Sequence, residues 1–295
     1  FENAFRTVET ADAKSSDETQ LKIALLILGR PQGAGANRIQ SMSKILSPRF
    51  STTLQQAALD SMMSTAVPDA AETIAAACPS LSYELQTTAI NGVLSLRNGP
   101  PTLLEAIQSG ALQSAVLNAS HRSQLLSSSD IDVRQLAEQL FAAGATTDRS
   151  TVVESMSAVL QLKGEAQQGR DVFRKRCSAC HRLEDHGHVV GPDLRALTNR
   201  DPQWLLTAML DPNKNVDGRY TSWIAATENG KTVFGMLAEE TTTAIRLREA
   251  GGKEHIIPRV EIEEFRTSGK SVMPEGLERD MTAQDFRNVI AYLSS

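Results

Sequence analysis

The spacing of apolar residues divides the chain into two parts with different periods. In the first half, apolar side chains recur every three or four positions, which is the pattern of a helix with one buried face. It predicts helices over residues 20–29, 53–63, 69–77, 84–96, 102–109, 111–126 and 130–143. Three apolar pairs also match at a separation of 31 residues: Leu54/Leu85, Ala58/Ala89 and Met62/Val93. Helix pairs repeated at this period are typical of a short α-solenoid of HEAT-like repeats, with an irregular helical bundle as the alternative.

Residues 1–148 therefore form the first predicted domain, a helical-repeat domain. Its sequence shows no paired acidic residues, phosphate-binding loop or nucleophile motif, so we expect it to serve as a scaffold or docking surface. Cys78 ends an apolar helix and is expected to be a buried packing residue. His121 is expected to face solvent, and Asp130 to cap the last helix. The small, polar stretch 143–150 is the predicted hinge to the second domain.

The second predicted domain, residues 149–295, is helical at both ends but changes to a period of two in its middle. Helices are predicted over residues 151–162 and 282–293, the latter with Thr282 as N-cap and Asp285 at its third position. Between them, alternating stretches flanked by turn residues such as Asn229-Gly230 predict strands over residues 220–227, 232–239, 244–248, 254–257 and 260–265. We therefore expect a small antiparallel sheet of four or five strands, at about residues 219–267, inserted into a helical domain.

The chemistry of the chain is concentrated in one pentapeptide, Cys177-Ser178-Ala179-Cys180-His181. Cys-x-x-Cys-His is the attachment pattern of c-type haem. Two thiols three positions apart lie on one side of a helical turn, where they can add to the two vinyl groups of the porphyrin. The histidine that follows supplies the proximal nitrogen to the iron. The motif occurs once, so it predicts one covalent haem c.

Two other uses of a Cys-x-x-Cys motif fit this sequence less well. A thioredoxin-like redox motif opens a helix after a strand in a βαβ unit, whereas the residues before Cys177 have a helical pattern. A structural zinc site needs four ligands, and the third cysteine, Cys78, lies far upstream.

Composition narrows the remaining possibilities. A formal net charge of −5 and a pI of about 5.6 argue against binding to nucleic acid. No apolar run reaches the length of a membrane span. No signal peptide is visible, and the start Phe1-Glu2-Asn3 indicates a processed chain or a piece of a larger one. Because haem is attached to Cys-x-x-Cys-His outside the cytoplasm in most systems, we expect a periplasmic or otherwise extracytoplasmic protein.

The residues around the motif resemble those of a class I cytochrome c. Gly169 and Phe173 precede the motif, Gly191-Pro192 follows it, and Met273-Pro274 comes before the last helix. The resemblance implies that the first and last helices of the domain cross at a small residue and aromatics. It also implies that the Pro192 carbonyl accepts a hydrogen bond from His181, and that Met273 is the second axial ligand.

From about residue 125 onward, the chain more closely resembles a haem-binding domain family first seen in Pirellula and Verrucomicrobium relatives. The matching stretches are GRDVFRKRCSACHRL, VGPDLRAL, LLTAMLDPNKNV, SVMPEGLERDMTAQD and AYL. In that family the domain often ends a long protein with helical repeats and a sorbosone-dehydrogenase-like β-propeller. The resemblance implies a dehydrogenase, fused or separate, as the redox partner, and no propeller is present in this sequence.

The sequence itself favours Met273 as the second ligand. Thioether sulfur suits haem iron, and Met273 lies in a polar loop where a large apolar side chain has no packing role. Three other methionines are expected to fill the core: Met209, Met236 and Met281. The alternative ligand is His255, in a predicted strand. Two histidines follow the motif too closely to reach the other haem face and are expected to lie in a loop: His186 and His188.

Four further residues have two interpretations each. Arg195 and Arg200 either meet a haem propionate or are ordinary surface residues. Trp204 and Trp223 either line the haem pocket or pack in the core.

The sequence therefore predicts a mainly α-helical protein whose second domain is a one-electron carrier with a single haem c. As a carrier it would accept electrons from a dehydrogenase and would not be an enzyme by itself. Two alternatives remain: a haem enzyme or sensor with an open distal site, and an interaction module dominated by the helical repeats. The inserted sheet is expected either to cover the haem edge or to present an acidic docking face with Glu261, Glu263 and Glu264. The alternative is a solvated edge whose charges only prevent pairing with another strand.

Overall fold

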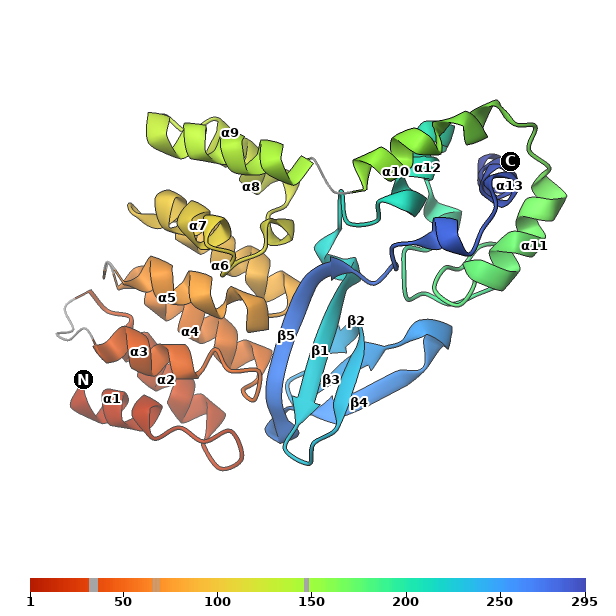
Figure 1. Cartoon of the computed structure of the whole chain (residues 1–295). Coiled ribbons are helices and arrows are strands. Elements are labelled where there is room, and N and C mark those ends of the chain that lie inside the picture. The colour runs from red at the N-terminus through yellow and green to blue at the C-terminus, as the bar shows by residue number, and fades with distance from the viewer. Residues whose placement is uncertain (32–36, 66, 68, 146–148) are drawn as a thin grey trace.

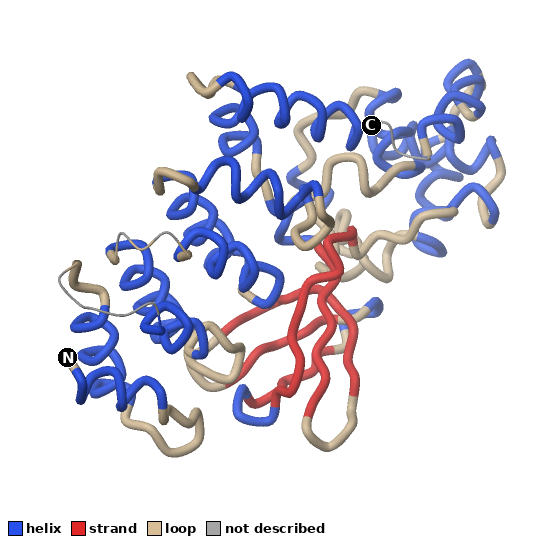
Figure 2. The backbone as a smooth tube through the Cα atoms, turned by 60° about the vertical axis from the view of Figure 1, so that its left-hand side comes forward, coloured by secondary structure: helices blue, strands red, loops and turns tan. Residues whose placement is uncertain are grey.

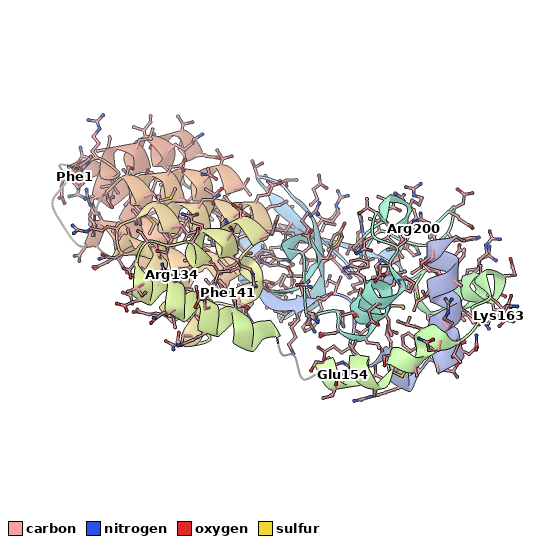
Figure 3. The ribbon with its side chains drawn as sticks, turned by 90° about the horizontal axis from the view of Figure 1, so that it is seen from above. Phe1, Arg134, Phe141, Glu154, Lys163 and Arg200 are labelled. Atoms are coloured by element: carbon pink, nitrogen blue, oxygen red, sulfur yellow. The ribbon has the colours of Figure 1, made fainter. Side chains whose placement is uncertain are left out.

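The computed structural model describes residues 1–31, 37–65, 67, 69–145 and 149–295, and it contains three parts (Figures 1 and 2). Seen from above, a sheet lies between a stack of helices and a smaller helical group (Figure 3). The stack contains α1 (Glu2–Glu9), α2 (Glu18–Leu28), α3 (Asn37–Lys44), α4 (Thr52–Ser64), α5 (Ala70–Ala77), α6 (Tyr83–Ser95), α7 (Gly99–Gln108), α8 (Ala119–Leu126) and α9 (Ile131–Ala145). The smaller group contains α10 (Ser150–Ser155), α11 (Ala166–Arg176), α12 (Pro202–Leu210) and α13 (Ala283–Ser294). The strands are β1 (Thr221–Thr227), β2 (Thr232–Glu240), β3 (Ala244–Arg248), β4 (Glu254–Pro258) and β5 (Ile262–Ser271).

The helical stack has two rows of helices. Along one row α2 contacts α4 and α4 contacts α6, and along the other α1, α3, α5, α7 and α9 follow one another. One apolar core runs between the rows, from Ala4 in α1 to Ala137 in α9. The six residues that match at a separation of 31 positions are all buried in it. The predicted apolar faces are therefore confirmed, while assignment of the stack to the HEAT-like class stays a prediction.

Within the helical stack, the sequence pattern missed two helices, α1 and α3, and made a third, α8, too long. α3 has only two buried apolar residues, Ile39 and Met42, so its period is too weak to detect. α8 is shorter than the predicted helix over residues 111–126, because Gly110 ends α7 with a φ of +77° and the chain then runs through a short 3-10 turn at Ser114–Val116.

Cys78 is buried as expected, and burial raises the pKa of its thiol to about 12.

His121 is buried, with 2% of its surface exposed, so the expectation that it faces solvent is wrong. The Asn118 side chain accepts a hydrogen bond from the His121 N–H, and the Asn118 N–H donates to His121 Nδ1, which makes a reciprocal cap at the start of α8. The other ring nitrogen lies 3.0 Å from Oδ1 of Asn91 in α6. Since Nδ1 accepts, Nε2 carries the proton and the ring is neutral. The buried imidazole therefore forms its hydrogen bonds with Asn118 and Asn91 and does not need water as a partner.

We expect the helical stack to lose stability as the pH falls from about 7 to 5. Burial lowers the pKa of His121 below its ordinary value, so the unfolded chain takes up a proton at a higher pH than the folded chain. The free energy of unfolding that neutral His121 contributes is fully present above the unfolded pKa of about 6.5, and it is lost as the pH falls below that value. The urea midpoint should fall over this range in the wild type and much less in His121→Gln. An equal dependence on pH in both proteins would rule out His121 as the cause.

The inserted sheet has the strand order β4-β3-β2-β1-β5, and each neighbouring pair is antiparallel. The predicted strands are confirmed, with β5 continuing to Ser271. Gly230 closes the β1–β2 turn at a φ of +81°. A bulge leaves Glu263 without a partner in β1, because Thr227 pairs with Ile262 and Ala226 with Glu264. For this reason Ile262 and Phe265 both face the core of the sheet although they are three positions apart.

In the smaller helical group, α11 and α13 cross in close contact. Gly169 lies at the crossing, where a Cβ atom would be 2.0 Å from the Asn288 carbonyl oxygen. Phe173 meets Tyr292 edge to face, with ring centroids 5.8 Å apart. Thr282 and Asp285 form the expected cap at the start of α13, each side chain accepting from the other's N–H. The helix crossing that the resemblance implied is therefore present.

We expect Gly169→Ala to destabilise the protein by about 1–3 kcal/mol, the usual cost of overpacking. The obstacle is a main-chain carbonyl, so the two helices must separate, which outweighs the gain of about 1 kcal/mol in helix propensity. Chemical denaturation measures the loss. Gln167→Ala, at an exposed position of the same helix, is the control and should stay within about 0.5 kcal/mol of the wild type. Equal stability of both variants would contradict the close crossing.

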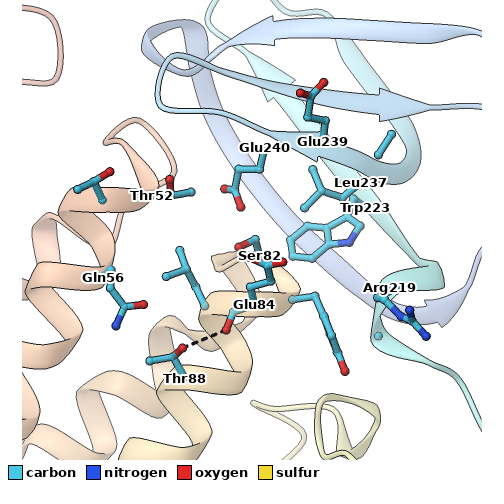
Figure 4. Close-up of a pocket in the computed structure, with 15 residues that line it drawn as sticks. Thr52, Gln56, Ser82, Glu84, Thr88, Arg219, Trp223, Leu237, Glu239 and Glu240 are labelled. Atoms are coloured by element: carbon cyan, nitrogen blue, oxygen red, sulfur yellow. Dashed lines mark hydrogen bonds between the residues drawn. The ribbon is translucent and has the colours of Figure 1, made fainter.

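Polar contacts anchor the sheet to the helical stack. Arg259, which is 1% exposed, pairs with Glu240 and donates to the Pro48 carbonyl in the stack at 2.7 Å. Arg49 in the stack pairs with Glu228 in the β1–β2 turn at 2.6 Å. Beside these contacts, residues of α4, α6 and β2 line a cavity of about 580 Å³ (Figure 4). The sheet is thus held firmly on the stack side.

The predicted hinge, residues 143–150, lies largely outside the residues whose side chains are described. Arg149 already belongs to the smaller helical group, because it donates to the Leu210 carbonyl at 2.9 Å and pairs with Glu278 at 2.6 Å. The division into domains at residue 148 stays a prediction.

In the described parts of the chain, no helix is long and apolar enough to cross a membrane.

Candidate haem site

Cys177, Cys180 and His181 lie on a turn that continues the end of α11. The Cys177 N–H donates to the Phe173 carbonyl at 2.8 Å, and the His181 N–H donates to the Cys177 carbonyl at 2.8 Å. The chain then folds back, so that the N–H groups of Val190 and Gly191 both donate to the Cys180 carbonyl, at 2.9 and 2.8 Å. This attachment turn, residues 177–181, brings both cysteines and the histidine to one cavity.

The imidazole of His181 is held by the segment that follows the turn. Its Nδ1 lies 2.9 Å from the Pro192 carbonyl oxygen, the hydrogen bond that the resemblance implied. Because that oxygen can only accept, Nδ1 carries the proton and Nε2 keeps its lone pair. Gly191 packs against the ring so closely that a Cβ atom would lie 2.6 Å from Cε1. The orientation of the ring is therefore fixed before any ligand is bound.

Burial sets the protonation of the three side chains. It raises the pKa of Cys177 to about 11, with a smaller contribution from Cys180, whose own pKa burial also raises. Burial lowers the pKa of His181, and the hydrogen bond to Pro192 partly opposes this shift. At pH 7 the site therefore holds two neutral thiols and a neutral imidazole. A neutral imidazole is the form that binds a metal ion.

The cavity has a volume of about 590 Å³, within the usual range for cofactor sites. Apolar side chains from α11, α12, α13 and the segment after the attachment turn form much of its wall: Phe173, Leu194, Leu197, Leu205, Met209, Val289 and Leu293. Polar residues line another part of it: Asp201, Gln203, Thr207, Asp211, Lys214, Asn215, Asp217 and Tyr220. This division suits a flat, largely apolar group whose edge reaches the polar part of the wall.

Met273 lines the same cavity as the attachment turn. It lies two positions after the end of β5, and its N–H donates to Ser271 Oγ at 3.1 Å. Its side chain is half-buried and packs against the apolar core around α12 and α13. The fold thus brings His181 and Met273, which are far apart in the sequence, to the same cavity. Ligation of iron by His181 and Met273 stays a prediction.

The three methionines that the sequence assigns to the core are buried, as predicted. Met209 also lines the cavity, whereas Met281 lies in the core around α13 and Met236 in β2. His186 and His188 are exposed loop residues, as expected. Trp204 lines the cavity and is 43% exposed.

The candidates in three of the alternatives that the sequence left open lie away from the cavity. His255, the alternative ligand, does not line the cavity, and its Nε2 lies 2.9 Å from Oε1 of Glu249. Trp223 packs in the core of the sheet, stacked on Phe265 with ring centroids 4.5 Å apart. Neither arginine proposed for a propionate lines the cavity: Arg195 pairs with Asp193 and Arg200 donates to the Ser295 carbonyl.

Most of the cavity wall consists of residues that the sequence did not mark as functional. Asp211, 2% exposed, ends α12 and faces the cavity, and Tyr220 reaches it from the turn before β1. Leu197 comes from the loop between the attachment turn and α12. None of these residues belongs to a motif. The helical period of residues 202–210 is the signal that could have indicated part of this wall.

The geometry does not support a structural zinc site or a thioredoxin-like motif. Among the described residues, no three His, Cys, Asp or Glu side chains are grouped as metal ligands, and Cys78 is buried in the helical stack. The cysteine pair also follows helix α11 and not a strand.

The residues present fit haem c. Two thiols and a preoriented imidazole open onto a cavity of suitable size, and a thioether lies on its wall. When bound, haem c supplies an iron that alternates between the ferric and ferrous states. The two cysteines would hold the group covalently, His181 Nε2 would be an axial donor, and the apolar wall would exclude water. The helix crossing, the attachment turn and this cavity together define a c-type cytochrome domain.

Comparisons with known proteins agree with this class. A family model for cytochrome c matches residues 166–245, so the chain contains a cytochrome c domain. The matched segment starts at α11 and ends in β3, before Met273. A cytochrome c-553-like protein of Synechocystis sp. is 40% identical over 48 residues, which are 16% of this chain and 45% of that protein. The chain thus matches less than half of that relative. The family match indicates covalent haem c and haem-based electron transfer for this domain.

Proposed function

We propose that this chain is a mono-haem c-type cytochrome that transfers one electron at a time, with His181 and Met273 as axial ligands. The observation that carries this proposal is the convergence of Cys177, Cys180, His181 and Met273 on one cavity of about 590 Å³. A histidine–methionine pair gives haem a higher reduction potential than two histidines. Such a potential suits a carrier that accepts electrons from an enzyme.

The proposed donor is a dehydrogenase, fused to this chain or separate. The resemblance of residues 125–295 to the Pirellula and Verrucomicrobium haem-binding family supports it, because that domain often accompanies a sorbosone-dehydrogenase-like propeller. In this proposal the helical stack, a HEAT-like scaffold, docks the partner. The protein acts in the periplasm or another extracytoplasmic compartment, where cytochrome c domains usually occur and haem is usually attached.

The surface of the sheet offers one docking candidate. Glu261, Glu263 and Glu264 are exposed, as the sequence predicted, although Glu264 is paired with Arg266. Acidic side chains at the rim of an interface mainly raise the rate of association with a basic partner. The role of this face stays a prediction.

Carbon monoxide separates the carrier from the alternative, a haem enzyme or sensor with an open distal site. If Met273 occupies the sixth position, the reduced protein should bind carbon monoxide slowly, at a rate limited by loss of the methionine. Stopped-flow mixing of reduced protein with carbon monoxide measures this rate at several gas concentrations. A fast reaction that rises in proportion to gas concentration would favour the open site and overturn the carrier proposal.

A further inference from the structure

The turn between β3 and β4 contacts the attachment turn directly, although the two are about 70 residues apart in sequence. The N–H of Gly251 donates to the Ala179 carbonyl, between the two cysteines, at 2.7 Å. Arg248 Nη1 donates to the Val189 carbonyl at 2.6 Å. Gly252 packs against His188, where a Cβ atom would lie 2.4 Å from Nδ1. We name residues 248–253 the strap.

The strap is held in this position by its own sheet. Glu249 N–H donates to the Lys253 carbonyl and Gly252 N–H donates to the Glu249 carbonyl, which closes the turn and leaves the Gly251 N–H pointing out of it. Glu254 Oε1 accepts from Nε and Nη2 of Arg248, at 3.0 and 2.7 Å. These two hydrogen bonds orient the guanidinium so that Nη1 points toward the loop after the attachment turn, where it donates to Val189. Figure 1 shows this end of the sheet directed toward the loop after α11.

The same sheet also holds the segment that carries Met273. The Val272 N–H donates to the Tyr220 carbonyl at 2.9 Å, extending the β1–β5 pairing by one step. The Ser271 N–H donates to Oδ1 of Asn213 at 2.8 Å. One rigid element thus contacts both sides of the cavity, the cysteine side through the strap and the methionine side through β5.

We propose that the strap positions the haem attachment turn, with Arg248 and Gly251 as positioning residues that help to set the reduction potential. This inference rests on the proposed function. The Ala179 and Val189 carbonyls lie on the loop that carries the cysteines, so releasing them lets that loop move and water approach the haem edge. Water stabilises the more highly charged ferric form, and solvent access is one of the factors that set haem potentials. Loosening the strap therefore lowers the potential.

Two glycines provide a matched test. Gly251 has a φ of +83° and Gly230 a φ of +81°, and a Cβ atom at either position meets nothing within 4 Å. Alanine at either site therefore introduces the same backbone strain in a turn of the same sheet, without a clash. Only Gly251 donates to the attachment turn, whereas the Gly230 N–H donates to the Thr227 carbonyl within its own turn.

In the haem-loaded protein, we expect Gly251→Ala and Gly230→Ala to lower the melting temperature equally. Gly251→Ala should lower the equilibrium constant for haem reduction at least threefold and speed hydrogen exchange at residues 178–191 at least fivefold. Gly230→Ala should leave both quantities unchanged. Equal potentials and equal exchange in the two variants would overturn the proposal.

A second pair tests Arg248. Arg248→Met keeps the aliphatic stem and removes the donor to Val189. Arg246→Met is its control, because Arg246 lies two positions earlier in β3, pairs with Glu239 and Glu254, and lacks the contact with Val189. Only Arg248→Met should shift the potential and the exchange rates, and equal behaviour of the pair would count against the strap. If the wild type binds no haem, the proposed function fails, and hydrogen exchange alone still decides whether the strap holds the turn.

Discussion

Protein in which Cys177 and Cys180 are both replaced by alanine should carry no covalently attached haem. Among the described residues these two are the cysteines that line the cavity, so their loss removes both thioether bonds while leaving His181 in place. Intact mass after expression with the haem-maturation machinery should equal that of the bare chain, whereas the wild type should be heavier by one haem. Each single variant should retain haem less efficiently than the wild type.

Cys78→Ala is the matched control for this experiment. Cys78 is the remaining cysteine, and it is fully buried in the helical stack, away from the cavity. It should retain one haem with the wild-type spectrum. Covalent haem in the double variant, or its loss in Cys78→Ala, would contradict the assigned attachment site.

Met273→Ala should cause the second largest change, loss of the weak near-infrared band of methionine bound to ferric haem. Removing the thioether withdraws a ligand that favours the ferrous state. The reduction potential should therefore fall by roughly 0.1 V or more, within the range of about 0.8 V that axial ligands control. Absorption spectroscopy and potentiometry measure the two effects, and carbon monoxide should then bind rapidly to the reduced variant.

Met209→Leu is a demanding control, because Met209 lines the same cavity from α12. It should keep the near-infrared band, since leucine conserves the apolar wall. Persistence of the band in Met273→Ala together with its loss in Met209→Leu would reassign the ligand to Met209. A low-spin wild type without the band would instead require a nitrogen ligand.

Local patterns were sufficient to predict most elements of this fold. Amphipathic helices have a period that survives without knowledge of their neighbours, so Leu54, Leu85 and their equivalents were recognised as core residues. The strands were detected by alternation and by Asn229-Gly230. The cysteine motif identified the cofactor because its geometry is contained within one helical turn.

What could not be predicted depends on contacts between distant segments. A lone polar residue such as His121 gives no periodic signal, and its burial depends on partners in α6 and at the start of α8. Which face of a strand meets the haem depends on how the whole sheet is docked, so Trp223 and His255 could not be placed. The contact of Gly251 with Ala179 likewise joins segments that no sequence pattern connects.

A spectroelectrochemical titration of the purified protein tests the central claim most directly. If the chain is a mono-haem electron carrier, the α-band of the reduced haem should appear and disappear reversibly along a single one-electron curve. Its slope should be about 59 mV for each tenfold change in the ratio of reduced to oxidised protein. Absence of a covalently bound chromophore, two separate redox steps, or irreversible reduction would contradict the account.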